Sequence, residues 1–531
     1  MAKRTQSKKQ SFFGGAAVLA IGIAIVKVIG AVFAIPLFNI LGDAGAADFN
    51  NAYNIYSALL VISTAGLPVA LSKMVSEANT LRREHEALRI FRVSFAAFLT
   101  LGAVSFLIMW FGNEWCAGLL HNPNAAYGIR VLAPAVVCVG CLAAFRGYAQ
   151  GSFRMTPTAV GQVMEALCKL FIGLALARHF IALGRGESIA AAGAIAGVTI
   201  GTVLALVYMV ADYFLHRVPP RTNDVPEPSG AILRRLVAIA VPVTVSSSMV
   251  SVITLIDTSL VQGQLQNALG YTLSETRHLY GTYSAVMKLY NLPASLMVAL
   301  TASVIPTLSG ALAARDRAQS TRVMNASLRV TALLAFPMGL GLWALAEPIT
   351  RLCYPNYDTV LGGELLAVLG IAALFVCLTL ISNSILQAHG AVRVPILSML
   401  VGGVAKIVLN YNLAAVPSIH IHAAPVGTLV CFVLSTAINL FFVWLVVRDK
   451  PSYFALFTKP LASSLIMAVA AKFCYALLSL RVGSNLVCVA VSVALAVVIY
   501  AALIIGLRVI SRDELMLLPK GEKLARLLRV E

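Results

Sequence analysis

Residues 12–41 read FFGGAAVLAIGIAIVKVIGAVFAIPLFNIL, a run whose only charged side chain is that of Lys27. A helix of about 20 apolar residues crosses the roughly 30 Å of hydrocarbon in a bilayer, so this run is long enough to do so. It is continuously apolar and does not alternate with polar residues, which excludes a strand of a β-barrel. The stretch therefore predicts a transmembrane helix near the start of the chain.

The composition of the whole chain extends this prediction. Of its 531 residues 59% are hydrophobic and 12% are charged, and the mean hydropathy is +0.87. A soluble domain cannot bury so much apolar surface, whereas a bilayer can. The basic start, MAKRTQSKKQ, runs directly into a span too long for the apolar region of a signal peptide, so no cleavable signal is predicted.

Thirteen further apolar runs follow the first, separated by short loops. The predicted spans are 12–41, 52–76, 91–112, 127–149, 157–179, 189–213, 234–262, 280–308, 327–347, 361–388, 395–415, 424–447, 456–480 and 483–507. The fold class is thus an all-α polytopic membrane protein with about fourteen transmembrane helices.

Basic residues in the predicted loops alternate from one side of the membrane to the other. One set of loops, together with both tails, holds 28 lysines and arginines, while the opposite loops and their edges hold six. Because loops rich in lysine and arginine stay in the cytoplasm, both termini are predicted to be cytoplasmic. The formal charge of +18 is spread over these loops, which favours contact with anionic membrane lipids over binding to nucleic acid.

The sequence also contains a weak internal repeat. Ser76, Arg82 and Arg89 correspond to Ser309, Arg315 and Arg322 at one constant offset. Gln150 and Lys169 correspond to Gln387 and Lys406 at a second offset, which is nearly equal to the first. Both offsets span six predicted helices, and an even number preserves the crossing direction, so the pattern predicts two parallel six-helix lobes.

The domain organisation follows from the spans and the repeat. The predicted parts are a cytoplasmic tail (1–11), a first lobe (12–213), a cytoplasmic linker (214–233), a second lobe (234–447), an accessory helix pair (456–507) and a cytoplasmic tail (508–531). The linker is rich in proline and polar residues, which suits a tether or hinge.

No arrangement of residues typical of catalysis is present. The sequence has no glycine-rich phosphate loop and no nucleophile with a neighbouring base, and His420 and His422 alone are too few to indicate a metal site. We therefore predict a membrane transporter and not an enzyme, with neither metal nor cofactor.

Charged residues within the spans are the candidate functional residues. A basic side chain at the bilayer centre costs about 2.5–3.5 kcal/mol, which a wet cavity or an anionic partner offsets. Lys27 lies mid-way along 12–41, the first span of the first lobe. Lys288 lies inside 280–308, the second span of the second lobe. Both side chains are predicted to face a cavity. Lys73 lies nearer the cytoplasmic end of its span, where its ammonium group either faces the cavity or reaches the membrane surface.

Other charged residues in the spans are candidates for coupling or gating. Glu165 and Lys169 stand four residues apart on one helix face and are predicted to form an ion pair. Asp257 has no basic residue in helical register, and it is a candidate to bind a coupling cation or proton or to pair with Lys288.

Prolines within the spans predict bends, since proline removes a backbone hydrogen bond from a helix. The predicted bends are at Pro36, Pro68, Pro242 and Pro293. Bent helices beside the gap between the lobes would suit a rocking motion.

Three stretches resemble a known family. They are IVKVIGAVFAIPLFNILGDAG (25–45), YNIYSALLVISTAGLPVALSKMVSE (53–77) and FRGYAQGSFRMTPTAVGQVMEALCKL (145–170). They look like the MurJ / stage V sporulation protein B branch of the multidrug/oligosaccharidyl-lipid/polysaccharide (MOP) exporter superfamily. The resemblance covers essentially the whole chain and implies fourteen helices, two six-helix lobes and transport by alternating access.

The resemblance also implies a substrate and some residue roles. The substrate is lipid II, the undecaprenyl-pyrophosphate-linked peptidoglycan precursor, flipped from the inner to the outer leaflet. The basic residue of the family's first-helix motif falls on Lys27, and the one before the proline of the eighth helix falls on Lys288. An acidic residue of the first external loop falls on Asp48, which is a further candidate for coupling or gating.

This chain departs from some relatives in the first two helices. Where they carry arginines, it has Phe33 and Leu60, which leaves Lys73 as a possible substitute. The resemblance further implies that the accessory pair and the second lobe form a groove for the polyprenyl tail.

Other hypotheses stay open at this point. They are a flippase for another undecaprenyl-linked polysaccharide unit, a MATE-like cation-coupled exporter and a non-transporting membrane scaffold of a wall-synthesis complex. The energy source is also open between Na⁺, H⁺ and the membrane potential. We expect a monomer in the bacterial cytoplasmic membrane, with membrane lipids as its surroundings.

Overall fold

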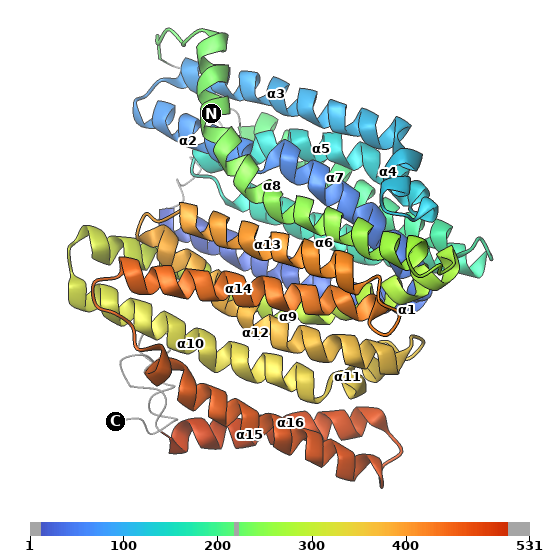
Figure 1. Cartoon of the computed structure of the whole chain (residues 1–531). Coiled ribbons are helices and arrows are strands. Elements are labelled where there is room, and N and C mark those ends of the chain that lie inside the picture. The colour runs from blue at the N-terminus through green and yellow to red at the C-terminus, as the bar shows by residue number, and fades with distance from the viewer. Residues whose placement is uncertain (1–11, 217–221, 508–531) are drawn as a thin grey trace, which may run out of the picture. The chain divides into compact units, whose positions relative to one another are not determined.

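The computed structural model describes residues 12–216 and 222–507, and every regular element in these ranges is helical, as predicted (Figure 1). The first elements are α1 (Phe12–Thr64), α2 (Leu67–Thr80), α3 (Glu84–Phe111), α4 (Asn113–Leu119), η1 (Pro123–Ala125), α5 (Ala126–Gly151), α6 (Thr156–Ala182), α7 (Glu187–His216) and α8 (Ser229–Asn267). They are followed by α9 (Leu273–Ala313), α10 (Arg317–Ala344), α11 (Ala346–Cys353), α12 (Thr359–Ala388), α13 (Arg393–Leu413), η2 (His420–His422), α14 (Ala423–Val446), α15 (Tyr453–Ser479) and α16 (Asn485–Gly506). The predicted tails, 1–11 and 508–531, and linker residues 217–221 lie outside the described residues.

Eleven helices of the described chain are long and apolar enough to span a membrane, or twelve if α8, bent by 41°, counts as one more. One of the eleven stretches, Ile21–Thr80, has 60 residues. At about 1.5 Å per residue it is roughly three times as long as the hydrocarbon is thick, so it cannot be a single crossing. Its first break is at Gly42, whose φ of +67° and ψ of 179° are not helical. The count of fourteen spans and the side of the termini stay predictions.

The backbone supports the predicted internal repeat. After α2, the N–H groups of Leu81, Arg82 and Arg83 donate to the carbonyls of Glu77, Asn79 and Ala78. After α9, the N–H groups of Ala314, Arg315 and Asp316 donate to the carbonyls of Gly310, Leu312 and Ala311, and all six positions follow the first offset. Arg82 and Arg315 both have a left-handed backbone, with φ of 56° and 55°. The two turns therefore have the same helix-ending hydrogen bonds and the same conformation.

The helices after these turns keep the predicted offsets. α3 and α10 begin at Glu84 and Arg317 and end at Phe111 and Ala344, and both pairs of ends follow the first offset. α6 and α13 begin at Thr156 and Arg393, which follow the second offset. The short helices α4 and α11 also begin at positions related by the first offset, although neither was predicted as an element. The repeat thus extends from single hydrogen bonds to whole helices.

The chain divides into two compact units, Met1–Gly281 (unit 1) and Thr282–Glu531 (unit 2). The division falls within α9, whereas the predicted linker between lobes is 214–233. α8 therefore packs within unit 1, although in the repeat it belongs to the second half. The lobe boundaries given above stay a prediction, and each unit is described by itself.

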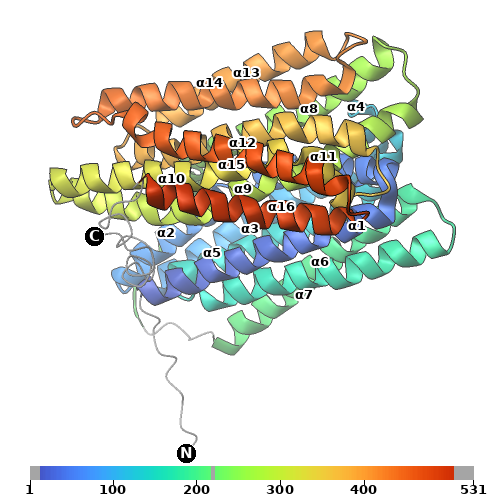
Figure 2. The ribbon, with the colours of Figure 1, turned by 90° about the horizontal axis from the view of Figure 1, so that it is seen from below.

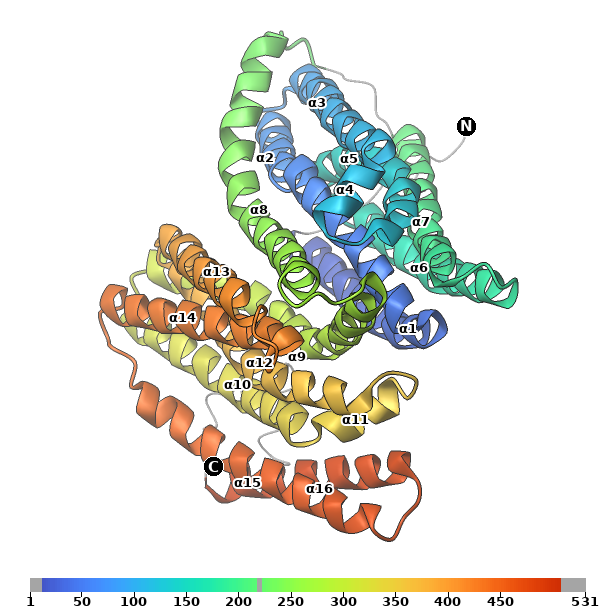
Figure 3. The same cartoon turned by 45° about the vertical axis from the view of Figure 1, so that its right-hand side comes forward.

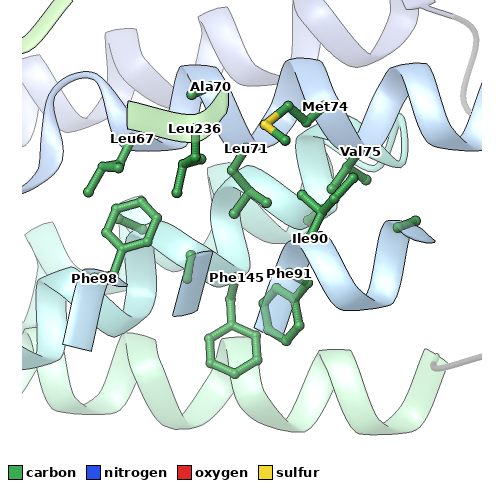
Figure 4. Close-up of a cluster of buried hydrophobic side chains, with 14 of the residues drawn as sticks. Leu67, Ala70, Leu71, Met74, Val75, Ile90, Phe91, Phe98, Phe145 and Leu236 are labelled. Carbon is green, nitrogen blue, oxygen red and sulfur yellow. The ribbon is translucent and has the colours of Figure 1, made fainter. Parts of the chain in front are cut away.

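The core of unit 1 lies where α2 packs against α3, α5 and α8. Leu71 and Phe98 are fully buried, and the tilted rings of Phe91 and Phe145 pack against each other in the same cluster with centroids 5.3 Å apart (Figure 4). α2 is able to approach α8 because Gly66 has no side chain, since a Cβ atom there would lie 2.0 Å from the carbonyl oxygen of Ala240. On the other side of the unit, α6 and α7 run side by side (Figure 2).

Unit 2 includes the predicted accessory pair. α15 and α16 lie side by side, and α15 packs on α10 (Figures 1 and 3). The contact uses the buried small residues Ala468 and Ala471, which lie in one cluster with Phe336 and Leu340 of α10. Small residues let membrane helices approach closely, which gains van der Waals contact. The accessory pair is thus joined to unit 2 by close helix packing.

The predicted linker is attached to unit 1 at the start of α3. The Asp224 carboxylate accepts hydrogen bonds from the backbone N–H groups of Glu86, at 2.9 Å, and His85, at 3.2 Å. The Thr222 hydroxyl accepts from the N–H of Glu84 at 3.2 Å and donates to Asp224. These three N–H groups belong to the first turn of α3, where no intrahelical carbonyl is available to them.

The repeat explains why α3 uses the linker. α10 is capped by its own Asp316, whose carboxylate accepts from the N–H of Gln319 at 2.9 Å. The residue that corresponds to Asp316 in the first half is Arg83, which cannot accept a hydrogen bond and whose side chain makes no cap. Asp224 from the linker therefore supplies the cap that the sequence next to α3 lacks.

The same contacts shift the ionisation of Asp224. Desolvation raises the pKa of this carboxyl group, but the hydrogen bonds from Thr222, Glu86 and His85 outweigh that effect and lower the pKa to about 2. The folded value lies below the ordinary value of about 3.9, so the carboxylate contributes stability above roughly pH 4. That contribution is lost as the pH falls from about 4 through about 2.

We predict that Asp224→Ala weakens the start of α3 by about 1 kcal/mol, as for the loss of other N-caps. Hydrogen exchange of the His85 and Glu86 amides should then become about fivefold faster. Adding Arg83→Asn should restore the protection, because Arg83 and Asp316 have similar backbone angles and asparagine is a good N-cap. Unchanged exchange in Asp224→Ala, or no recovery in the double variant, would contradict this account.

Candidate functional site

The predicted cavity lysines are distributed over both units. Lys27 on α1 and Lys73 on α2 are exposed, and neither forms an ion pair with another described residue. Lys288 on α9 is half-buried. Lys27 and Lys73 belong to unit 1 and Lys288 to unit 2, so their predicted meeting in one cavity stays a prediction.

Lys27 lies on a part of α1 that is thinly covered by the described chain. Its neighbours Ile23 and Val28 are 38% and 63% exposed, whereas Gly22 is buried against Ala159 of α6. An ammonium group within an apolar span needs water or an anion beside it. The Lys27 side chain is therefore available to a partner from outside the protein.

The predicted ion pair between Glu165 and Lys169 is not formed, which is a correction. Glu165 on α6 instead pairs with Arg146 of α5, at 3.1 Å, and accepts a hydrogen bond from Thr202 of α7 at 3.4 Å. Arg146 lies within α5, and its side chain is only 16% exposed. The guanidinium group is more weakly hydrated than an ammonium group, which favours arginine over lysine as the partner of a half-buried carboxylate.

Lys169 has aromatic partners in place of Glu165. Its ammonium nitrogen lies 5.0 Å from the ring centre of Phe33 and 4.8 Å from that of Tyr53, both on α1. Such cation–π contacts stabilise a charge where water is scarce. Tyr53 also stacks on Phe49, with centroids 5.8 Å apart.

Together these residues form a charged cluster inside unit 1. Arg146 and Lys169 carry positive charges and Glu165 one negative charge, so the cluster has an excess of one positive charge. Sequence reasoning missed Arg146 and the aromatic residues, because a single sequence does not show which helices are neighbours. The cluster gives α1, α5, α6 and α7 a common polar contact within the span.

Asp48 is the centre of a second polar cluster, and its position corrects a prediction. It was expected in an external loop, but the helix resumes directly after Gly42, so Asp48 lies within α1 and is 1% exposed. Arg277 donates to both of its carboxylate oxygens, at 2.6 and 3.0 Å. Ser188 of α7 and Asn122 also donate to it, at 2.7 and 2.9 Å. A buried carboxylate is stable here because charge and hydrogen bonds are both supplied.

Polar side chains also join α8 to α1 at the same end of unit 1. The amides of Asn51 and Gln262 bond to each other in both directions, at 3.0 and 3.1 Å. Asn54 donates to Thr258 at 3.1 Å. Asp257, next to Thr258, is 5% exposed, and its predicted role in coupling is not tested by its position. By the predicted topology this end faces outwards.

Of the four prolines predicted to bend helices, three lie inside a helix and one lies in the first turn of a helix. Pro36 lies inside α1, and Pro293 lies within the range of α9. Pro68 is in the first turn of α2, directly after the helix break at residues 65–66, where proline costs no hydrogen bond. Pro242 lies in α8, three residues before the end of its first straight segment, Ser229–Val245.

The side chains that could bind a metal ion are dispersed in residues 12–216 and 222–507. They contain no group of three or more histidine, cysteine, aspartate or glutamate side chains that could hold a metal ion. His422 instead pairs with Glu364 at 2.9 Å.

The family models and relatives reported below identify the chain as a transporter of the MOP superfamily, and the chain is a multi-pass bacterial membrane protein. It belongs to the polysaccharide biosynthesis protein family, whose model matches residues 12–312; the MatE family model matches residues 242–412.

Curated relatives come from Bacillus subtilis (strain 168). The uncharacterized membrane protein YabM is 26% identical over 82% of this chain and 80% of its own length. Lipid II flippase MurJ is 24% identical over 83% of each chain, and stage V sporulation protein B is 22% identical over 96% of this chain and 98% of its own.

Solved structures share the fold. Lipid II flippase MurJ in an inward closed conformation has a TM-score of 0.69 at 15% identity, over 92% of this chain and 98% of that one. An inward-facing multidrug resistance MATE family transporter of the MOP superfamily has a TM-score of 0.65 at 14% identity, over 82% of this chain and all of that one.

A double-mutant cycle on thermal unfolding in detergent tests the corrected ion pair. We predict that Glu165→Gln and Arg146→Gln are coupled by about 1 kcal/mol or more, because removing either partner leaves a half-buried charge. Glu165→Gln and Lys169→Met should be additive to within about 0.5 kcal/mol. Coupling between Glu165→Gln and Lys169→Met, with additivity of Glu165→Gln and Arg146→Gln, would instead support the Glu165–Lys169 pair expected from the sequence.

Proposed function

We propose that this protein is a flippase that moves lipid II, the undecaprenyl-pyrophosphate-linked peptidoglycan precursor, from the inner to the outer leaflet by alternating access. The observation that carries the proposal is the exposed ammonium group of Lys27 in an apolar span of a MOP-superfamily transporter. A pyrophosphate that crosses a membrane needs cations at membrane depth, and lysine attracts it without fixed bidentate geometry. An attraction without fixed geometry suits a substrate that must be released.

Relatives support this substrate class. The family description concerns polysaccharide biosynthesis, and one relative is named as a lipid II flippase. Another undecaprenyl-linked polysaccharide unit would present the same pyrophosphate, and it is the alternative within the proposal. A MATE-like exporter, coupled to Na⁺ or H⁺, is the second alternative. In the proposal, the accessory pair α15–α16 provides a surface for the polyprenyl tail.

Alternating access also has a structural candidate in unit 1. Asn51–Gln262 and Asn54–Thr258 hold α8 against α1 near the buried Asp48–Arg277 pair. Paired amides exchange readily for bonds to water, so these contacts are able to open without leaving a buried charge. We propose that their separation opens the outer end. The cycle would be driven by Na⁺, H⁺ or the membrane potential, with Asp257 a candidate for ion coupling.

The substrate site is tested in cells depleted of their native lipid II flippase. We predict that the wild-type chain restores lipid II to the outer leaflet in an accessibility assay, and that Lys27→Ala lowers the signal at least about tenfold, the effect of losing one charged contact of about 1.4 kcal/mol. Lys27→Arg should keep most of the activity because it keeps the charge. Lys288→Ala should behave like Lys27→Ala.

The matched control is Lys472→Ala, which also removes a lysine from a membrane helix. Lys472, on α15, has a partner within unit 2, because its ammonium lies 5.4 Å from the ring centre of Trp343 on α10. It is therefore not needed to hold the pyrophosphate or the apolar tail, and its loss should leave flipping unchanged. Failure of the inserted wild-type chain to restore outer-leaflet lipid II would refute the proposal. Normal flipping by Lys27→Ala would remove its main support.

The opening step is tested by cross-linking. In a chain whose nine cysteines are replaced by serine, Asn51→Cys and Gln262→Cys are joined by a short thiol-reactive cross-linker. We predict that the joined protein stops flipping, while the reagent has no effect on either single variant. Undiminished flipping by fully cross-linked protein would show that this contact stays closed during the cycle.

A further inference from the structure

A cavity of about 290 Å³ lies in unit 2, where four helices end together. Its walls come from the C-terminal ends of α9, α12 and α14 and from the start of α10. We propose that this cavity binds the phosphate of an anionic phospholipid from the inner leaflet. It is separate from the membrane-depth lysines and does not rest on the proposed function.

The charges of the cavity are mainly positive. Arg315, Arg317 and Arg448 line it, all three are exposed, and none forms an ion pair with another residue of the described ranges. Two aspartates also line it, but both have neutral partners. Asp316 caps the start of α10, and Asp449 accepts from the Thr321 hydroxyl at 2.9 Å. The guanidinium groups are therefore the groups still available to a ligand.

The repeat allows the cavity to be compared with the corresponding helix ends of unit 1, where two arginines form ion pairs. There Arg154 pairs with Asp212 at 2.9 Å, and Arg235 pairs with Glu77. The start of α3 receives the carboxylate of Asp224. Asp212 is the counterpart of Asp449, which has Thr321 and no arginine as its partner. Arg82, the counterpart of Arg315, is exposed and forms no ion pair with a described residue, as Arg315 does not. Unit 2 differs because three arginines without an ion-paired acid line one cavity, which indicates that their anion comes from outside.

The depth and lining of the cavity favour a lipid. The ends of membrane helices lie at the level of the headgroups, and the lysine and arginine bias assigns this end to the cytoplasmic leaflet. Basic pockets between helices on that side bind anionic headgroups. Leu312, Val446 and Val447 add apolar wall beside the arginines, which suits the junction of a headgroup and its acyl chains. A free phosphate would use only the arginines.

The test measures lipid binding to the purified full chain by native mass spectrometry, with phosphatidylglycerol and phosphatidylcholine as probes. We expect wild type to retain phosphatidylglycerol in preference to phosphatidylcholine. Arg315→Gln/Arg448→Gln should weaken phosphatidylglycerol binding about tenfold or more. The thermal unfolding temperature of the variant without lipid should equal that of wild type, which excludes misfolding.

The matched control is Arg82→Gln/Arg92→Gln in unit 1. It removes the same charge from the same predicted side, and Arg82 shares with Arg315 its place in the repeat and its left-handed backbone. This variant should bind phosphatidylglycerol like wild type. An equal loss in both variants would overturn the proposal in favour of general surface charge.

A further arm separates the two sources of phosphate. Inorganic phosphate at millimolar concentration should not displace phosphatidylglycerol, because it lacks the acyl chains that contact the apolar wall. Displacement by inorganic phosphate would overturn the lipid assignment and identify a site for a soluble anion. No preference of wild type for phosphatidylglycerol would refute the site itself.

Discussion

A charged side chain inside a bilayer must have a partner, and this constraint accounts for much of what the structure shows. Asp48 is fully buried, yet Arg277 supplies the opposite charge and Ser188 and Asn122 supply further hydrogen bonds. Glu165 has Arg146, and Lys169 has two aromatic rings. Lys27 differs from these residues because the described chain leaves it exposed and without an acid. Its partner is therefore sought outside the protein.

The features that depend on helix length and polarity could be predicted from the sequence. The apolar runs follow from local composition, and the six-helix repeat follows from matching residues at constant offsets, whereas the alternation of basic loops stays a prediction. The structure then shows the repeat in finer detail than the sequence, down to the same three hydrogen bonds at two helix ends. Helices α4 and α11 were missed because elements of seven and eight residues are too short for a span and carry little periodic signal.

The site could be predicted only in part, and the reason is that partners come from other helices. The spacing of Glu165 and Lys169 indicated a local pair, but it contained no sign that α5 brings Arg146 closer. Asp48 was placed in a loop because residues 42–51 are less apolar than the spans. The helix continues there because a single glycine turns the chain, and Ala44, Ala46 and Ala47 then resume the helix.

The linker cap has a consequence for how the two halves have diverged. A duplicated structure begins with interchangeable halves, but α3 now depends on a residue far along the chain for the cap that α10 takes from its neighbour. The start of α3 therefore needs no acid at position 83, because Asp224 supplies the carboxylate. The connector has thus become part of one module, and a transplant of the first half without it would lose the cap at the start of α3.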